Sequence, residues 1–151
     1  MTDTEQVRIL IVDDDETIRK SITTVLEEKG YLADTAENGR AAIGKSEKEV
    51  YKLALIDIRL PDMDGVQLLT ALKETTPKMV KIIITGYPSL QNAVEAVNKG
   101  ADGYIVKPIK MGELLTMIKE HLKKQQEAGK YTEQKVVEFI ETRAKELESR
   151  R

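Results

Sequence analysis

The sequence contains no cysteine and no tryptophan, a single histidine, and few aromatic residues, which make up 4 % of the chain. Without cysteine, disulfide bonds and thiolate metal sites are excluded. With so few aromatic residues, a core must be built mainly from aliphatic side chains. The single histidine, His121, has no metal-ligand partner at a suitable spacing, so we expect it to be a solvated residue of a Lys-rich helix.

Long apolar runs and an excess of charge of one sign are also missing. No apolar run approaches the roughly 20 residues of a membrane span, and the opening residues MTDTEQVR lack the apolar segment of a signal peptide. We therefore expect a cytoplasmic protein. A net charge of −2 gives no general attraction to nucleic acid or to an anionic membrane. The 151 residues, 40 % of them hydrophobic, suffice for one domain with a core.

Five short apolar segments alternate with stretches of helical periodicity. The segments are four to six residues long and rich in β-branched residues, which is typical of buried strands. Alternation of strands with helices predicts βαβ units and a parallel sheet covered on both faces. The expected strands are residues 7–12, 31–36, 53–58, 81–85 and 103–106.

Polar residues that favour helix ends stand between these segments. We expect Asp15, Asn38, Asp64 and Ser89 to be N-caps, because their side chains can accept hydrogen bonds from the first turn of a helix. Gly30 and Gly100 follow helical stretches and are expected to end them in the left-handed conformation.

Several chemically active side chains lie where the expected strands end. Asp13 and Asp14 follow the first strand, Asp57 lies at the end of the third, Thr85 ends the fourth and Lys107 follows the fifth. In an open parallel sheet, sites form beyond the carboxyl ends of the strands. Oxygen ligands without histidine or cysteine suit Mg²⁺ or Mn²⁺. A cation and an ammonium group beside one carboxylate predict a phosphoryl-transfer site.

Four stretches together resemble the receiver domain of two-component response regulators: ILIVDDDETIR, LALIDIRLPDMDG, IIITGY and ADGYIVKP, in the order and spacing of that family. The resemblance implies a CheY-like, flavodoxin-like doubly wound (βα)5 fold with strand order 2-1-3-4-5. We expect it to span residues 1–124.

The resemblance also implies roles for individual residues. Asp57 would be the phosphoacceptor, receiving a phosphoryl group from a sensor histidine kinase. Asp13, Asp14, Asp57 and the backbone carbonyl of Arg59 would hold Mg²⁺ or Mn²⁺. Phosphorylation and dephosphorylation would be self-catalysed at Asp57, with no separate enzymatic output domain.

Thr85 and Lys107 would contact the phosphoryl group, beside which Gly86 leaves room. Tyr104 would turn inward as Thr85 moves, and so change a surface of the fourth helix, fifth strand and fifth helix that a downstream partner or a second protomer reads. The Lys107–Pro108 peptide would be cis. Because Arg59 and Tyr87 are large, we predict slow autodephosphorylation.

Two alternative functions compete with this one. The stretch GRAAIGKS, residues 39–46, fits the P-loop pattern of ATP- and GTP-hydrolysing enzymes. Its RAAI segment favours a helix, whereas a phosphate-binding segment must be a loop, so we expect the second helix instead. The other alternative is a pseudo-receiver, a protein-interaction module that is never phosphorylated.

Residues 125–151 differ in character from the rest. We expect QQEAGK (125–130) to be a linker or break, followed by an amphipathic C-terminal helix. That helix could bind a partner or a second protomer, pack back on the domain, or lead toward an output domain. It is too short for a helix-turn-helix DNA reader. We predict that Val136, Ile140 and Leu147 promote self-association.

Overall fold

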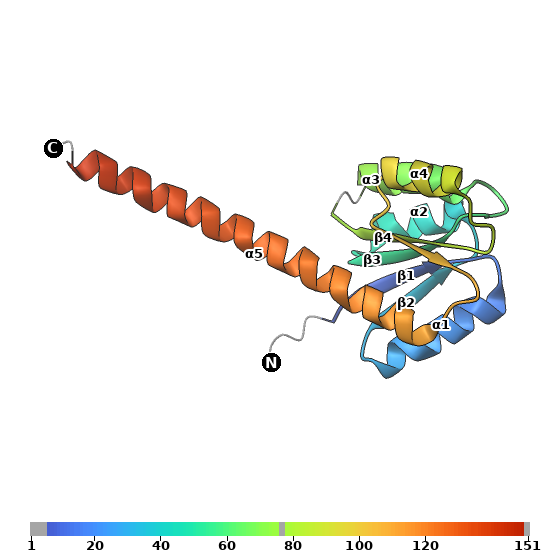
Figure 1. The fold of residues 1–151 in the computed structure, drawn as a ribbon. Coiled ribbons are helices and arrows are strands. Elements are labelled where there is room, and N and C mark those ends of the chain that lie inside the picture. The colour runs from blue at the N-terminus through green and yellow to red at the C-terminus, as the bar shows by residue number, and fades with distance from the viewer. Residues whose placement is uncertain (1–5, 76–77, 150–151) are drawn as a thin grey trace.

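A computed structural model describes residues 6–75 and 78–149 of the chain (Figure 1). Strands and helices alternate as expected. Their bounds are β1 (Arg8–Val12), α1 (Glu16–Glu28), β2 (Leu32–Ala36), α2 (Gly39–Lys48), β3 (Leu53–Asp57), α3 (Gly65–Thr75), β4 (Val80–Thr85), α4 (Leu90–Asn98), β5 (Gly103–Val106) and α5 (Met111–Ser149).

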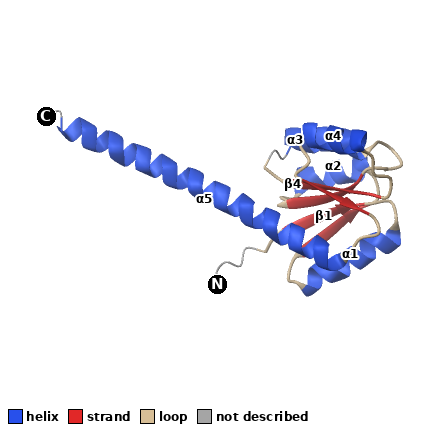
Figure 2. Cartoon of the chain, in the orientation of Figure 1, coloured by secondary structure: helices blue, strands red, loops and turns tan. Residues whose placement is uncertain are grey.

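The strands form one parallel sheet in the order β2-β1-β3-β4-β5. Figure 2 shows this sheet in red between the helices. This order confirms the doubly wound prediction. The central strands β3 and β4 are buried along their whole length, mostly with aliphatic side chains. Because all five strands are parallel, they present their carboxyl ends at the same edge of the sheet.

Two aliphatic cores cover the two faces of the sheet. One lies beneath α2, α3 and α4 and includes Leu68, Leu72 and Ala96. The other lies beneath α1 and α5 and includes Ile22 and Leu114. Figure 1 shows these helices as two layers with the sheet between them.

The predicted helix ends are confirmed. Oδ1 of Asp15 accepts hydrogen bonds from the backbone N–H groups of Thr17 and Ile18, and Asn38 and Ser89 cap α2 and α4 in the same way. Gly30 and Gly100 follow α1 and α4 with φ angles of 89° and 104°, which a residue with a Cβ rarely adopts.

The linker or break predicted at residues 125–130 is wrong. Helix α5 is continuous over 39 residues and carries the tail away from the domain (Figure 1). The physical reason is that glutamine, glutamate, alanine and lysine are good helix formers, and one glycine in a helix costs only about 1 kcal/mol. The tail also does not pack back on the domain, because Val136, Ile140 and Leu147 are each more than half exposed.

Among the described residues, no helix is both long enough and apolar enough to cross a membrane.

Candidate functional site

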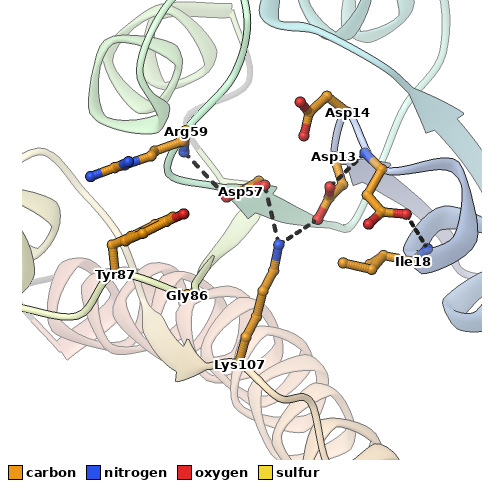
Figure 3. Close-up of a pocket in the computed structure, with 9 residues that line it drawn as sticks. Asp13, Asp14, Ile18, Asp57, Arg59, Gly86, Tyr87 and Lys107 are labelled. Atoms are coloured by element: carbon orange, nitrogen blue, oxygen red, sulfur yellow. Dashed lines mark hydrogen bonds and ion pairs between the residues drawn. The ribbon is translucent and has the colours of Figure 1, made fainter.

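Three carboxylates gather at the carboxyl edge of the sheet (Figure 3). Asp13 and Asp14 follow β1, and Asp57 is the last residue of the neighbouring strand β3. One oxygen atom from each of these carboxylates lies within 4.8 Å of the other two. Asp13 and Asp57 are buried whereas Asp14 is exposed, so the cluster opens to solvent on the Asp14 side. These residues border a pocket of about 550 Å³.

Lys107 reaches into this cluster from the end of β5. Its Nζ lies 3.2 Å from Oδ2 of Asp13 and 3.3 Å from Oδ2 of Asp57. Burial works to lower the pKa of Lys107, but the charges and hydrogen bonds of the two carboxylates outweigh it and raise the pKa. Lys107 therefore stays an ammonium ion at neutral pH, held between two carboxylates that face it from separate strands.

Asp13 is held in place by its own backbone turn. Its Oδ1 accepts a hydrogen bond of 2.9 Å from the N–H of Asp15. Burial raises the pKa of Asp13, and the negative charge of Asp57 adds to this, while the Asp15 N–H and Lys107 act in the opposite direction. The site thus holds more negative charge than one ammonium group balances, which is the situation that a bound cation relieves.

One rim of the pocket consists of a stacked pair. The guanidinium carbon of Arg59 lies 3.6 Å from the centre of the Tyr87 ring. The backbone N–H of Arg59 also donates to Oδ1 of Asp57, at 3.2 Å. Figure 3 shows the two large side chains beside Asp57, opposite Asp13 and Asp14. Together they cover one side of the approach to the Asp57 carboxylate.

Thr85 lies at the end of β4 but is fully buried and does not line the pocket. Its Oγ1 accepts a hydrogen bond of 2.9 Å from the N–H of Tyr87. Gly86 does line the pocket, and a Cβ there would make only ordinary contact with the Lys107 side chain. The predicted contact of Thr85 with a phosphoryl group stays a prediction.

Tyr104 is half-buried in β5 and packs against the core beneath α4. Within the described part of the chain, its buried hydroxyl has no hydrogen-bond partner. A buried hydroxyl without a hydrogen-bond partner costs free energy. A different position of the ring that gave the hydroxyl a partner would remove this cost. The expected cis peptide is confirmed at Lys107–Pro108.

The sequence did not predict all the hydrogen bonds that hold the β3–α3 loop in place. Asp64 caps α3 as predicted, its Oδ1 accepting from the Gln67 N–H. Asp62 instead caps a different helix: its carboxylate accepts from the backbone N–H groups of Gly39 and Arg40, at 2.8 and 2.9 Å, and these bonds lower its pKa. No local pattern signals this bond, because Asp62 and α2 are distant in sequence.

Gly65 was also missed. A Cβ at this position would lie 2.7 Å from the backbone oxygen of Asp57, so only glycine lets the start of α3 approach the end of β3. A signal was present in the sequence, since glycine is a poor residue with which to begin a helix. The pair Asp64–Gly65 could have indicated a close backbone approach.

The P-loop alternative is wrong. Residues 39–46 lie inside α2 rather than in a loop, and the side chain of Ser46 is buried with its hydroxyl donating to the carbonyl of Ile43. His121 is half-buried rather than fully solvated, because its Nε2 lies beside Gly103 of β5. Among the described residues, the metal-binding group that the structure brings together does not include it.

Comparison with known proteins agrees with this geometry. The family model described as "Response regulator receiver domain" matches residues 9–119. The transcriptional regulatory protein ZraR of Klebsiella oxytoca is 38 % identical over 118 residues, which are 78 % of this chain and 27 % of that protein. Protein ResD of Bacillus subtilis is 34 % identical over 82 % of this chain and 51 % of its own length. The chain thus spans between a quarter and about half of these curated relatives.

Solved structures show the same likeness. A response regulator receiver domain protein, CheY-like, from Methanospirillum hungatei is 45 % identical, with a TM-score of 0.81 over 82 % of this chain and 99 % of that one. The beryllofluoride-activated NtrC4 receiver domain dimer is 38 % identical, with a TM-score of 0.75 over 78 % of this chain and 98 % of that one.

Proposed function

This chain belongs to the response regulator receiver domain family, and we propose that Asp57 is its phosphoacceptor in a two-component system. The donor is a sensor histidine kinase. The observation that carries this proposal is the position of Asp57, with the Lys107 ammonium 3.3 Å from one carboxylate oxygen and the carboxylates of Asp13 and Asp14 beside it. The curated relatives are longer proteins, so the output of the whole system is not assigned.

The donor set at this edge suits a hard divalent cation. Three carboxylates with a single ammonium group, and no histidine or cysteine among them, provide the oxygen ligands that Mg²⁺ and Mn²⁺ prefer. Asp13, Asp14 and Asp57 would hold the ion, together with the backbone carbonyl of Arg59. When bound, such an ion supplies positive charge that stabilises the oxygens of a transferring phosphoryl group.

Asp57 and Lys107 then have different roles in the phosphoryl transfer. A carboxylate oxygen of Asp57 forms a bond to phosphorus as the bond from phosphorus to the donor's histidine nitrogen breaks. The electron pair of the broken bond stays on that nitrogen. Lys107, already 3.3 Å from Asp57, neutralises charge on the phosphoryl oxygens. The reaction is self-catalysed in that these groups belong to the receiver itself, with no separate enzymatic output domain needed.

Thr85 and Tyr104 connect the modified carboxylate to the surface. The Thr85 hydroxyl accepts a hydrogen bond from Tyr87, and its own hydrogen remains available to donate to a phosphoryl oxygen. Among the described residues the Tyr104 hydroxyl has no hydrogen-bond partner, and movement of Thr85 toward Asp57 would let this hydroxyl turn to a new position. Such a change shifts the population of a two-state surface.

The face that would report this change is apolar and exposed. Leu90, Val94 and Val97 recur at helical spacing along α4, and Val106 of β5 is exposed as well. An exposed apolar patch of this kind marks an interaction surface. We assign it to a downstream protein or a second protomer, in a cytoplasmic setting.

The test is intact-mass spectrometry after incubation with acetyl phosphate and Mg²⁺. We expect a single phosphoryl adduct that is lost in Asp57→Asn and when the metal is chelated. Asp64→Asn is a matched control, because it makes the same chemical change in a carboxylate that caps α3 outside the pocket, and it should keep the adduct. Absence of an adduct in wild-type protein that binds Mg²⁺ would contradict the proposal and favour the pseudo-receiver.

A further inference from the structure

The loop of residues 59–64 joins β3 to α3 and lies mostly in water. Leu60 and Met63 are partly buried against the core, whereas the other four residues of the loop are exposed. The two ends of the loop are held together by the isolated bridge between Arg59 and Asp64. Since so little of the loop is buried, the position of its tip depends on a few individual contacts.

Asp62 makes such a contact from the tip of the loop. Its Oδ1 accepts a hydrogen bond of 2.8 Å from the backbone N–H of Gly39, and its Oδ2 accepts one of 2.9 Å from that of Arg40. Both N–H groups belong to the first turn of α2, where the helix has no partner of its own for them and where negative charge is favourable. The carboxylate thus uses both of its oxygens on a helix that precedes it by more than 20 residues in the chain.

The neighbouring residues show that this contact joins the loop to α2 and does more than end the helix. A Cβ on Gly39 would clash with the side chain of Met63, so the loop lies directly against the first residue of α2. Helix α2 also has an N-cap of its own, because the side chain of Asn38 accepts a hydrogen bond of 2.8 Å from the N–H of Ala41. The hydrogen bonds to Asp62 therefore add a connection between two separate elements.

We propose that Asp62 is a positioning residue for the cation site, and that it acts through Arg59. This inference rests on the proposed function, in which the backbone carbonyl of Arg59 is a ligand of the divalent cation. The same loop carries Arg59, whose N–H donates to Oδ1 of Asp57 at 3.2 Å. By fastening the tip of the loop to α2, Asp62 restricts the positions that Arg59 can take. Less conformational freedom is then lost when a cation binds, which strengthens binding.

The connection acts in both directions. Because the coupling between two sites is reciprocal, a cation that holds the Arg59 carbonyl also favours the arrangement in which Asp62 is bonded to α2. The start of α2 then responds to occupation of the site. This response does not pass through Thr85 or Tyr104, which the proposed function connects to the surface of α4 and β5.

Binding of Mn²⁺ to the full, unphosphorylated chain tests the proposal, with the free ion measured by electron paramagnetic resonance. We expect the dissociation constant to rise about three- to tenfold in Asp62→Ala. Asn38→Ala is the matched control, because it removes a cap from the same end of α2 but leaves the N–H groups of Gly39 and Arg40 bonded to Asp62. It should leave the constant within about twofold. An unchanged constant in Asp62→Ala, or an equal rise in Asn38→Ala, would overturn the proposal.

Asp62→Asn separates the position of the loop from the charge of the carboxylate. The amide keeps an oxygen that can accept one of the two hydrogen bonds, but it carries no charge. Its dissociation constant should therefore lie between those of the wild type and Asp62→Ala. A rise as large as that in Asp62→Ala would mean that Asp62 acts only through its charge, and would overturn the positioning role. A wild-type chain that binds no Mn²⁺ would instead contradict the proposed function, and this inference with it.

Hydrogen exchange of single amides, followed by nuclear magnetic resonance, tests the reciprocal effect. Saturating Mg²⁺ should slow exchange at Gly39 and Arg40 of the wild type by about threefold or more. The amide of Ala41, which is bonded to Asn38 at the start of the same helix, is the internal control and should change by less than about twofold. In Asp62→Ala, the response to Mg²⁺ should disappear. Exchange at Gly39 and Arg40 that Mg²⁺ leaves unchanged in a wild-type chain that binds the ion would overturn the coupling.

Discussion

The two halves of α5 carry similar apolar stripes but meet different surroundings. In the first half, Leu114 and Ile118 are fully buried against the sheet, whereas in the second half Ile140 and Leu147 are about 60 % exposed. Both halves are helical and both stripes lie on nearly the same side of the helix. Helical periodicity thus defines an apolar face, but the neighbouring elements decide whether that face is buried in the core or stays exposed.

The largest expected difference is between two leucines of α5. Leu114→Ala should lower the free energy of unfolding by about 2–5 kcal/mol, because it leaves a cavity in the core. Leu147→Ala should change it by less than about 0.5 kcal/mol in the monomer, since most of that side chain is already in water. Urea unfolding followed by circular dichroism at low protein concentration measures both. Equal losses would mean that the tail is covered within the monomer.

Two glycines provide the next comparison. A Cβ on Gly65 would lie 2.7 Å from the Asp57 backbone oxygen, whereas a Cβ on Gly44 in α2 would meet nothing within 4 Å. We expect Gly65→Ala to destabilise the protein by about 1–3 kcal/mol through overpacking. Gly44→Ala should stabilise it by about 0.5–1 kcal/mol, since alanine favours a helix. Chemical denaturation distinguishes the two signs, and destabilisation by both would contradict the expectation for Gly44.

Two tyrosines differ in their surroundings, since Tyr51 is buried and Tyr87 is largely exposed. Burial raises the pKa of Tyr51, and its hydrogen bond of 2.7 Å to Asp34 and the charge of that carboxylate raise it further. The folded state therefore favours the neutral phenol. Its contribution to stability is fully present below pH 10, the ordinary tyrosine pKa, and is lost as pH rises above it.

At pH 7, Tyr51→Phe should be less stable than wild type by about 1.5 kcal/mol, because it loses a hydrogen bond to a charged group. This gap should narrow as pH rises above about 10. Tyr87→Phe is the control for removing a phenol hydroxyl, since Tyr87 is largely exposed, and at pH 7 it should change the free energy of unfolding by less than about 0.5 kcal/mol. Thermal unfolding at several pH values measures both gaps. A Tyr51 gap that widens at alkaline pH would show the opposite sign of linkage.

The smallest effect expected concerns the lifetime of phosphorylated Asp57. Because Arg59 stacks on Tyr87 at the rim of the pocket, the pair should hinder the approach of water to the phosphorus atom. Arg59→Ala and Tyr87→Ala should each speed the loss of phosphate by about three- to tenfold, roughly 1 kcal/mol in activation free energy. Arg40→Ala, at an exposed position on α2, should leave the rate unchanged. An unchanged decay in both rim variants would refute this role.

Much of the fold could be read from the sequence because its signals are local. The apolar runs, the caps at Asp15, Asn38 and Ser89, and the glycines after α1 and α4 each depend on a few neighbouring residues. The cluster of Asp13, Asp14, Asp57 and Lys107 could be predicted because strand ends are visible in the sequence. Two features could not be predicted, because each depends on an element far away in the chain. They are the hydrogen bond that Asp62 accepts from the start of α2 and the partial burial of His121.

The sequence by itself determined the strands, the starts of the first four helices, and the set of polar residues at the ends of the strands. Propensity, capping and periodicity act within a few turns, so they can be read locally. Only the tertiary structure decided that Lys107 lies between Asp13 and Asp57, which are 94 and 50 residues away. It also decided that Thr85 is buried and that the apolar side chains in the second half of α5 are exposed. These features depend on how the strands are ordered and on where the sheet ends beneath α5, and no short stretch of residues contains that information.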